Sequence, residues 1–236
     1  MEKVLYPLWK DASLSGDAFR DHLLAELTPA LAAMDAVRAL RLAVVDGAVE
    51  AGDKRRMESH PPLPDAMLSL WVDNAGAAQV WEPVIDANVA RKIAYLVAEA
   101  EPLVNQQAHP TEPGERMYGM CQVVFFSFPK KQERDSYLSV WKDSHTQVAI
   151  DTQSTFGYRQ NVVVRRLGED TPYCDVIVEE NFPPEAMADD HAFYATGGDE
   201  AILKKHMTEM GESCTRFIDF GTIDVIPMSE YLVKPL

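Results

Sequence analysis

The chain has 236 residues, of which 47% are hydrophobic, so it can form one large or two small globular domains, and extensive disorder is not expected. A formal net charge of −15 with only short basic clusters argues against a nucleic-acid partner. Three widely separated cysteines suggest neither a disulfide framework nor a zinc knuckle, and no apolar stretch is long enough to span a bilayer, so a cytoplasmic protein without a membrane partner is expected.

The sequence pattern of the first half predicts a strand, a helix and a strand, followed by a second strand, helix and strand. Its apolar patterns place the elements at residues 4–9 (strand), 17–34 (helix, interrupted at Pro29), 37–45 (strand), 66–72 (strand), 75–91 (helix, broken near Pro83) and 95–100 (strand). Residues 105–114 are rich in proline and polar residues. We therefore expect a boundary there, which divides the chain into residues 1–110 and 111–236.

The second half predicts the same succession of elements. Strands are expected at 120–128, 156–165, 173–178 and 217–225, with helices at 133–151, 184–195 and 200–210. An offset of 118 positions superposes Phe19 on Tyr137, Leu23 on Trp141 and Leu27 on His145 without a gap. The sequence thus predicts an α+β fold of two tandem ferredoxin-like β-α-β-β-α-β repeats, whose sheets bury their open faces against each other.

Residues 137–161 contain the main candidate for a functional site. Tyr137, Trp141 and His145 are spaced by four, which places them on one face of a helix, directed at the apolar interior. Gly157 then provides a bend into a strand. A helix that carries a histidine over a sheet is a plausible plan for a pocket.

These residues carry a resemblance to a known family. Trp141, His145, Gly157, Tyr158 and Asn161 match, position by position, the helix and the following strand of the EthD domain family of dimeric α/β-barrel proteins. Two departures occur: Gln147 stands where a proline is usual, and the first half is a degenerate copy with Leu27 in the histidine's place. The resemblance implies a pocket between sheet and helices in each half. It also implies a homodimer and a superfamily of cofactor-free cyclases, decarboxylases, dehydratases, small monooxygenases and some haem proteins.

His145 is the leading candidate for catalysis. A histidine can exchange a proton near neutral pH, and burial against Trp141 favours its neutral, basic form. The alternative is a packed core histidine without a catalytic role. Leu27 at the equivalent position shows that packing alone does not demand a histidine there.

The remaining candidates are less distinctive. His191, beside Asp189 and Asp190, is a second candidate acid or base, with a solvated helix start as the alternative. Substrate contacts are expected from Tyr137, Trp141, Tyr158, Arg159, Phe125 and Tyr194, although Tyr158 and Arg159 point to opposite faces of their strand and Arg159 has an ion pair as its alternative role. The other histidines are expected at the surface: His22, His60, His109 and His206.

Several chemistries lack their motifs. No His, Asp and Glu group has the spacing of metal ligands, and neither a phosphate-binding glycine loop nor a nucleophile elbow is present, so no metal and no cofactor are expected. We therefore expect a cofactor-independent lyase that removes carbon dioxide, formaldehyde or water from a small phenolic compound. A cofactor-free oxygenase and a non-catalytic binding protein are the alternatives.

Overall fold

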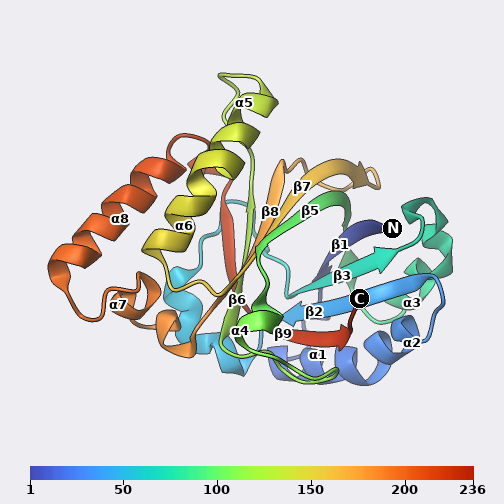
Figure 1. Cartoon of the computed structure of the whole chain (residues 1–236). Coiled ribbons are helices and arrows are strands. Elements are labelled where there is room, and N and C mark those ends of the chain that lie inside the picture. The colour runs from blue at the N-terminus through green and yellow to red at the C-terminus, as the bar shows by residue number, and fades with distance from the viewer.

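The structure is a computed structural model that describes residues 1–236, and its centre is a closed antiparallel barrel of eight strands (Figure 1). Around the barrel the strands follow the order β3-β2-β9-β6-β8-β7-β5-β1, and β1 closes the ring on β3. A ninth, short strand, β4, pairs with the end of β1. The bounds are β1 Glu2–Trp9, β2 Val37–Val44, β3 Ala66–Val72, β4 Arg91–Lys92, β5 Ala94–Leu103, β6 Met120–Phe126, β7 Gly157–Leu167, β8 Val176–Phe182 and β9 Asp224–Lys234.

Helices cover the outside of the barrel in two groups, α1 to α3 on one side and α5 to α8 on the other (Figure 1). The bounds are α1 Gly16–His22, α2 Thr28–Ala32, α3 Glu82–Asp86, α4 Asn105–Ala108, α5 Arg134–Ser139, α6 Thr146–Thr152, α7 Asp190–Phe193 and α8 Glu200–Cys214. Four 3-10 segments complete the structure, at Gly47–Arg55, Ala75–Val80, Pro184–Met187 and Phe220–Thr222. None of the helices combines the length and the apolar character that crossing a membrane requires.

Each half of the chain contributes four neighbouring barrel strands. In the first half the neighbours are β2-β3-β1-β5, and in the second half they are β7-β8-β6-β9. The halves join through the antiparallel pairs β2–β9 and β5–β7, so the barrel closes within one chain. The two sheets predicted from the sequence thus form one continuous barrel, because pairing their edge strands satisfies backbone groups that would otherwise stay open.

The predicted helix at 17–34 and its counterpart at 133–151 share an unusual detail. A π-helical turn, Leu23–Leu27, separates α1 from α2, and another, Val140–His145, separates α5 from α6. The offset of 118 positions places Leu23–Leu27 on residues 141–145. A π turn widens the helix locally and redirects the side chains that follow it, and such turns are frequent at functional sites.

Successive side chains of each strand point alternately into the barrel and toward the helices outside it. Val4, Tyr6 and Leu8 of β1 pack under α1 to α3, while Leu5 points into the barrel. The interior has two parts. One end is apolar, and the other holds a buried ionic cluster of Lys3, Arg159, Asn161, Glu179 and Glu230.

The structure corrects three sequence predictions. The last strand is Asp224–Lys234 and not 217–225, because it continues through two polar residues that are buried: Glu230 points into the barrel, and Ser229, on the opposite face, bonds Asp46 at 2.6 Å. The helix predicted at 75–91 is a 3-10 segment followed by the short α3, which ends at Asp86. Strand β8 starts three residues later than 173 and runs through Glu179 and Glu180 to Phe182.

Candidate functional site

A cavity of about 290 Å³ lies between the second-half strands and the helices that cover them. Strands β6, β7, β8 and β9 form its floor, and its roof comes from the α5–α6 segment, α7, α8 and the loop that follows α8. Most of its lining is apolar or aromatic, and the polar or charged members are Arg55, Gln122, His145, Gln153 and Glu180. A concave, largely apolar space with a few polar groups is the usual form of a small-molecule site.

His145 reaches this cavity from the last residue of the π turn Val140–His145. Its Nδ1 lies 2.9 Å from the Oγ of Ser213 on α8, and its ring lies 4.7 Å from that of Phe217. Ser213 therefore fixes the ring, and Nε2 is the nitrogen without a protein partner. Burial, assisted by the charge of Arg216, lowers the pKa of His145 to about 4, so the imidazole is neutral at pH 7.

Glu180 is the second titratable group of the cavity. It lies in the middle of β8 between Gln122 of β6 and Tyr158 of β7, and all three line the floor. Glu180 is 8% exposed, and no side chain holds its carboxyl group by a hydrogen bond or an ion pair. Burial alone raises the pKa of Glu180 to about 7, so both of its forms are populated near neutral pH.

The residues of the glycine-tyrosine-asparagine motif have separate structural tasks. A Cβ at Gly157 would lie 2.5 Å from Oδ1 of Asn181, so only glycine fits. Tyr158 Oη accepts a hydrogen bond of 2.9 Å from Nε1 of Trp141, which ties the helix to the strand at the cavity wall. Asn161 points the other way, into the barrel, where its Nδ2 donates to Glu179.

The structure brings together four of the eight residues predicted for the site. His145, Trp141, Tyr158 and Tyr194 line the cavity. The other four lie elsewhere, and their positions follow from strand alternation and helix packing.

Tyr137 stacks on Phe128 with ring centroids 5.5 Å apart, within the core beyond the cavity. Phe125 points into the barrel, opposite to the helix side of its strand. Arg159 also lies inside the barrel, where Nη2 is 3.4 Å from Oε1 of Glu179. These three side chains therefore do not reach the cavity.

His191 lies on α7 outside the cavity. Its Nδ1 is 2.6 Å from Oγ1 of Thr196, and its Nε2 is 3.3 Å from Oε1 of Glu200. Both ring nitrogens thus have local partners. This agrees with the alternative role given above for His191, a residue at the start of a helix.

Sequence reasoning missed Glu180, although a signal was present. Glu179 and Glu180 are consecutive in a strand that begins with three apolar residues, so they must point to opposite faces and one of them must face the helices. A carboxyl group under an apolar helix layer indicates a site, because an unpaired charge is costly there.

The equivalent region of the first half is filled by side chains. Leu27 occupies the position that corresponds to His145, and it is fully buried in the core under α1 to α3. Trp81 fills the same core, and its Nε1 donates a hydrogen bond of 2.8 Å to Tyr6 Oη. The cavity with titratable groups therefore belongs to the second half.

No group of three or more His, Cys, Asp or Glu side chains is placed to hold a metal ion. Arg55 is the one cation that lines the cavity, and its Nη2 is bound to Asp190 at 2.9 Å. The interior of the cavity thus offers the neutral imidazole of His145 and the titrating carboxyl group of Glu180 in an apolar setting.

Comparison with known proteins shows the fold. No family model and no curated protein sequence matches the chain. Among solved structures, it is similar to an anthrone oxidase-like protein, with a TM-score of 0.54 and 10% identity over 98% of this chain and 91% of that one. It is also similar to a putative monooxygenase from Lactobacillus acidophilus NCFM, with a TM-score of 0.50 and 9% identity over 99% and 95% of the two chains.

Both likenesses extend over nearly the whole chain, and at 10% and 9% identity they show the fold alone. The molecule is thus an α+β protein whose centre is a closed antiparallel barrel of eight strands.

Proposed function

We propose that the chain is a cofactor-independent enzyme that acts on a small phenolic compound bound in the cavity of His145 and Glu180. The observation that carries the proposal is that one carboxyl group and one imidazole line the same apolar cavity with shifted pKa values. The pKa of the carboxyl group is raised and that of the imidazole is lowered, so their usual order is reversed. Displaced pKa values of two groups in one cavity are a frequent mark of acid–base catalysis.

The roles follow from the two pKa values. Glu180, with a pKa of about 7, can accept a phenolic proton as a carboxylate and return a proton as an acid. His145, with a pKa of about 4, is a weak base at neutral pH, so its free Nε2 serves to hydrogen-bond the reacting oxygen. Trp141, Tyr158 and Tyr194 surround the ring of the substrate.

We favour a lyase reaction that removes carbon dioxide, formaldehyde or water from a side chain of the phenol. When carbon dioxide or formaldehyde leaves, a C–C bond breaks, and the carbon left behind must gain a proton. When water leaves, a C–O bond breaks, and the departing hydroxyl must gain a proton. In each case a group that takes and returns protons near pH 7 meets the need, which Glu180 provides.

The test is a panel of phenolic acids and alcohols with three readouts: carbon dioxide, formaldehyde and oxygen uptake. Product release without oxygen uptake supports the lyase. Oxygen uptake identifies a cofactor-free oxygenase, a candidate in keeping with the names of the two similar proteins, an anthrone oxidase-like protein and a putative monooxygenase. Retention of a phenol without any product identifies a binding protein. The purified protein is expected to show no Soret band.

Replacing His145 with alanine is expected to lower kcat/KM about 10- to 100-fold, because a hydrogen bond to a charged group contributes about 1.5–3 kcal/mol. The matched control is His191→Ala, whose ring nitrogens are engaged outside the cavity, so turnover should change little. Steady-state kinetics, with thermal unfolding to check the fold, measure both. Equal losses in the two variants would contradict the assignment of His145.

Three further parts of the interpretation belong to this proposal. The two halves, divided near residues 110 and 111, are proposed to be tandem ferredoxin-like repeats, which the matching strand orders and π turns support. Membership of the EthD family within the superfamily is proposed from the motif. A cytoplasmic homodimer is proposed as well, and the molar mass in solution tests the dimer.

A further inference from the structure

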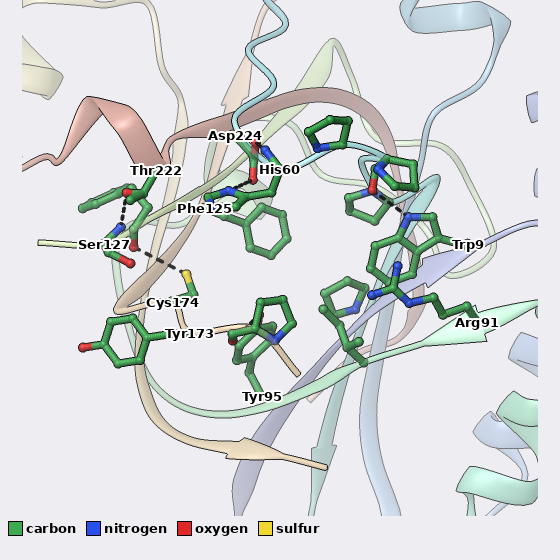
Figure 2. A pocket seen from close by; sticks show the side chains of 17 residues that line it. Trp9, His60, Arg91, Tyr95, Phe125, Ser127, Tyr173, Cys174, Thr222 and Asp224 are labelled. Carbon is green, nitrogen blue, oxygen red and sulfur yellow. Dashed lines mark hydrogen bonds and ion pairs between the residues drawn. The ribbon is translucent and has the colours of Figure 1, made fainter. Parts of the chain in front are cut away.

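A second cavity, of about 210 Å³, opens at the apolar end of the barrel (Figure 2). It lies inside the sheet, whereas the cavity of His145 and Glu180 lies outside it. Phe125 lines the barrel cavity alone, Trp141 and His145 line the other cavity alone, and Phe126 contributes to the lining of both. The two spaces can therefore take different ligands.

The walls of this barrel cavity are aromatic. Trp9, Tyr95 and Phe125 surround it, and Ile93 adds an aliphatic side chain (Figure 2). Tyr95 Oη donates a hydrogen bond of 3.1 Å to the carbonyl oxygen of Pro172, and Trp9 Nε1 donates one of 3.0 Å to that of Pro62. Because these polar atoms are already engaged, the walls present mainly ring surface to a ligand.

Two basic side chains lie at the mouth of the cavity. The guanidinium carbon of Arg91 is 4.1 Å from the ring centroid of Trp9, and no carboxylate forms an ion pair with Arg91. Stacking on Trp9 holds its planar head in place while its N–H groups remain available.

His60, expected at the surface, is held at the same mouth by a buried aspartate. Its Nδ1 is 3.0 Å from Oδ2 of Asp224, and Oδ1 accepts from the backbone N–H groups of Ser59 and His60 at 2.6 and 2.9 Å. Three donors thus occupy the Asp224 carboxylate, and His60 keeps Nε2 free of protein partners. The mouth consequently offers an unpaired guanidinium and an oriented imidazole beside an aromatic chamber.

We propose that the barrel cavity is a second small-molecule site, which binds a single-ring aromatic carboxylate with the ring against Tyr95 and Phe125 and the carboxylate at Arg91. The volume of about 210 Å³ is below the range of about 300–1,000 Å³ for sites of drug-sized ligands, so one ring is the fitting size. Arginine matches a carboxylate in shape and charge, which gives the polar end its partner.

The experiment uses the full-length protein labelled with 5-fluorotryptophan and titrated with benzoate. The chain has four tryptophans, so four 19F resonances are assigned from Trp→Phe variants. Trp9 reports on the barrel cavity, and Trp141 reports on the other cavity. A saturable shift of the Trp9 resonance is the expected result.

Arg91→Gln is expected to weaken benzoate binding by about tenfold, the effect of losing one charge-assisted hydrogen bond. The matched control is Arg38→Gln, an exposed arginine of β2 that pairs with Asp73 away from the cavity, and it should bind benzoate unchanged. Benzamide, an uncharged analogue with the same ring, should bind the wild type as weakly as benzoate binds Arg91→Gln.

Three results would overturn the proposal. The first is a Trp9 resonance that does not move, or that moves without saturating. The second is equal benzoate affinity in the Arg91 and Arg38 variants. The third is a shift confined to the Trp141 resonance, which would place benzoate in the outer cavity alone.

Discussion

Replacing Glu180 with glutamine is expected to lower kcat/KM by about 10²–10⁴, the usual contribution of general acid–base catalysis. The amide keeps the shape of the side chain but carries no titrating proton, and the cavity has no other carboxyl group. In the wild type, kcat/KM should change as Glu180 titrates around pH 7, and Glu180→Gln should lose that part of the pH profile. Steady-state kinetics from pH 5 to 9 measure both effects.

The same substitution is expected to alter stability in a characteristic way. The folded-state pKa of Glu180 is raised from 4.5 to about 7, so the carboxyl group is less easily ionised in the folded protein than in the unfolded chain. Its favourable contribution is complete below pH 4.5 and is lost as pH rises through 7. The full loss is about 3 kcal/mol, from 1.36 kcal/mol for each pKa unit.

Denaturant unfolding of both proteins across this pH range isolates the contribution, because all other groups titrate alike. The free energy of unfolding of the wild type should fall with pH relative to Glu180→Gln. The matched control is Glu185→Gln, an exposed glutamate at the surface, which should follow the wild type. If Glu180→Gln keeps wild-type turnover but shows the stability difference, Glu180 is a buried, unpaired carboxyl group without a catalytic role.

The bounds of a strand can be predicted where the local sequence pattern determines them. They cannot be predicted where burial depends on partners that are distant in the sequence. Residues 66–72 form a short and almost wholly apolar run, which is sufficient to recognise a strand with its observed bounds. Strand β9 was misplaced because Ser229 and Glu230 look solvent-exposed in the sequence. Glu230 is 2% exposed because it meets Arg159, which lies 71 positions away in the sequence.

The candidate site shows the same division. Helical spacing was sufficient to direct His145 at an apolar interior, since the period of the helix and the following strand are local features. The difference between Glu179 and Glu180 is not local. Glu179 is paired because barrel closure brings Lys3 to it from 176 positions away at 2.8 Å, whereas no cation pairs with Glu180.

Replacing Arg159 with methionine is expected to lower the free energy of unfolding at pH 7 by about 3–5 kcal/mol, because breaking a buried ion pair leaves uncompensated charge. Arg159 is 1% exposed, and its Nη2 lies against carboxylate oxygens of both Glu179 and Glu230. Burial alone would raise the pKa of Glu179, but Lys3 and Arg159 hold that pKa well below its usual range. Methionine keeps an unbranched apolar stem while removing the guanidinium group and its charge.

The consequences for pH and for activity separate this role from a catalytic one. Since the folded-state pKa of Glu179 is depressed, its contribution is present above 4.5 and is lost as pH falls, so the deficit of Arg159→Met should shrink in acid. Turnover per folded molecule should change little, because Arg159 does not line the cavity. Arg38→Met, at an exposed ion pair, is the control and should change the free energy of unfolding little.

A double-mutant cycle completes the argument for the ionic cluster. Glu230 also accepts hydrogen bonds from Nδ2 of Asn181 at 2.7 Å and of Asn105 at 3.3 Å, and the amide oxygen of a glutamine can accept both. Adding Glu230→Gln to Arg159→Met removes a carboxylate that would otherwise keep only Arg41 as a cationic partner, at 3.4 Å, so the pair should recover part of the stability that Arg159→Met loses. Strictly additive losses would show that Arg159 stabilises the barrel by packing alone, and a loss of turnover in folded Arg159→Met would return it to the candidate site.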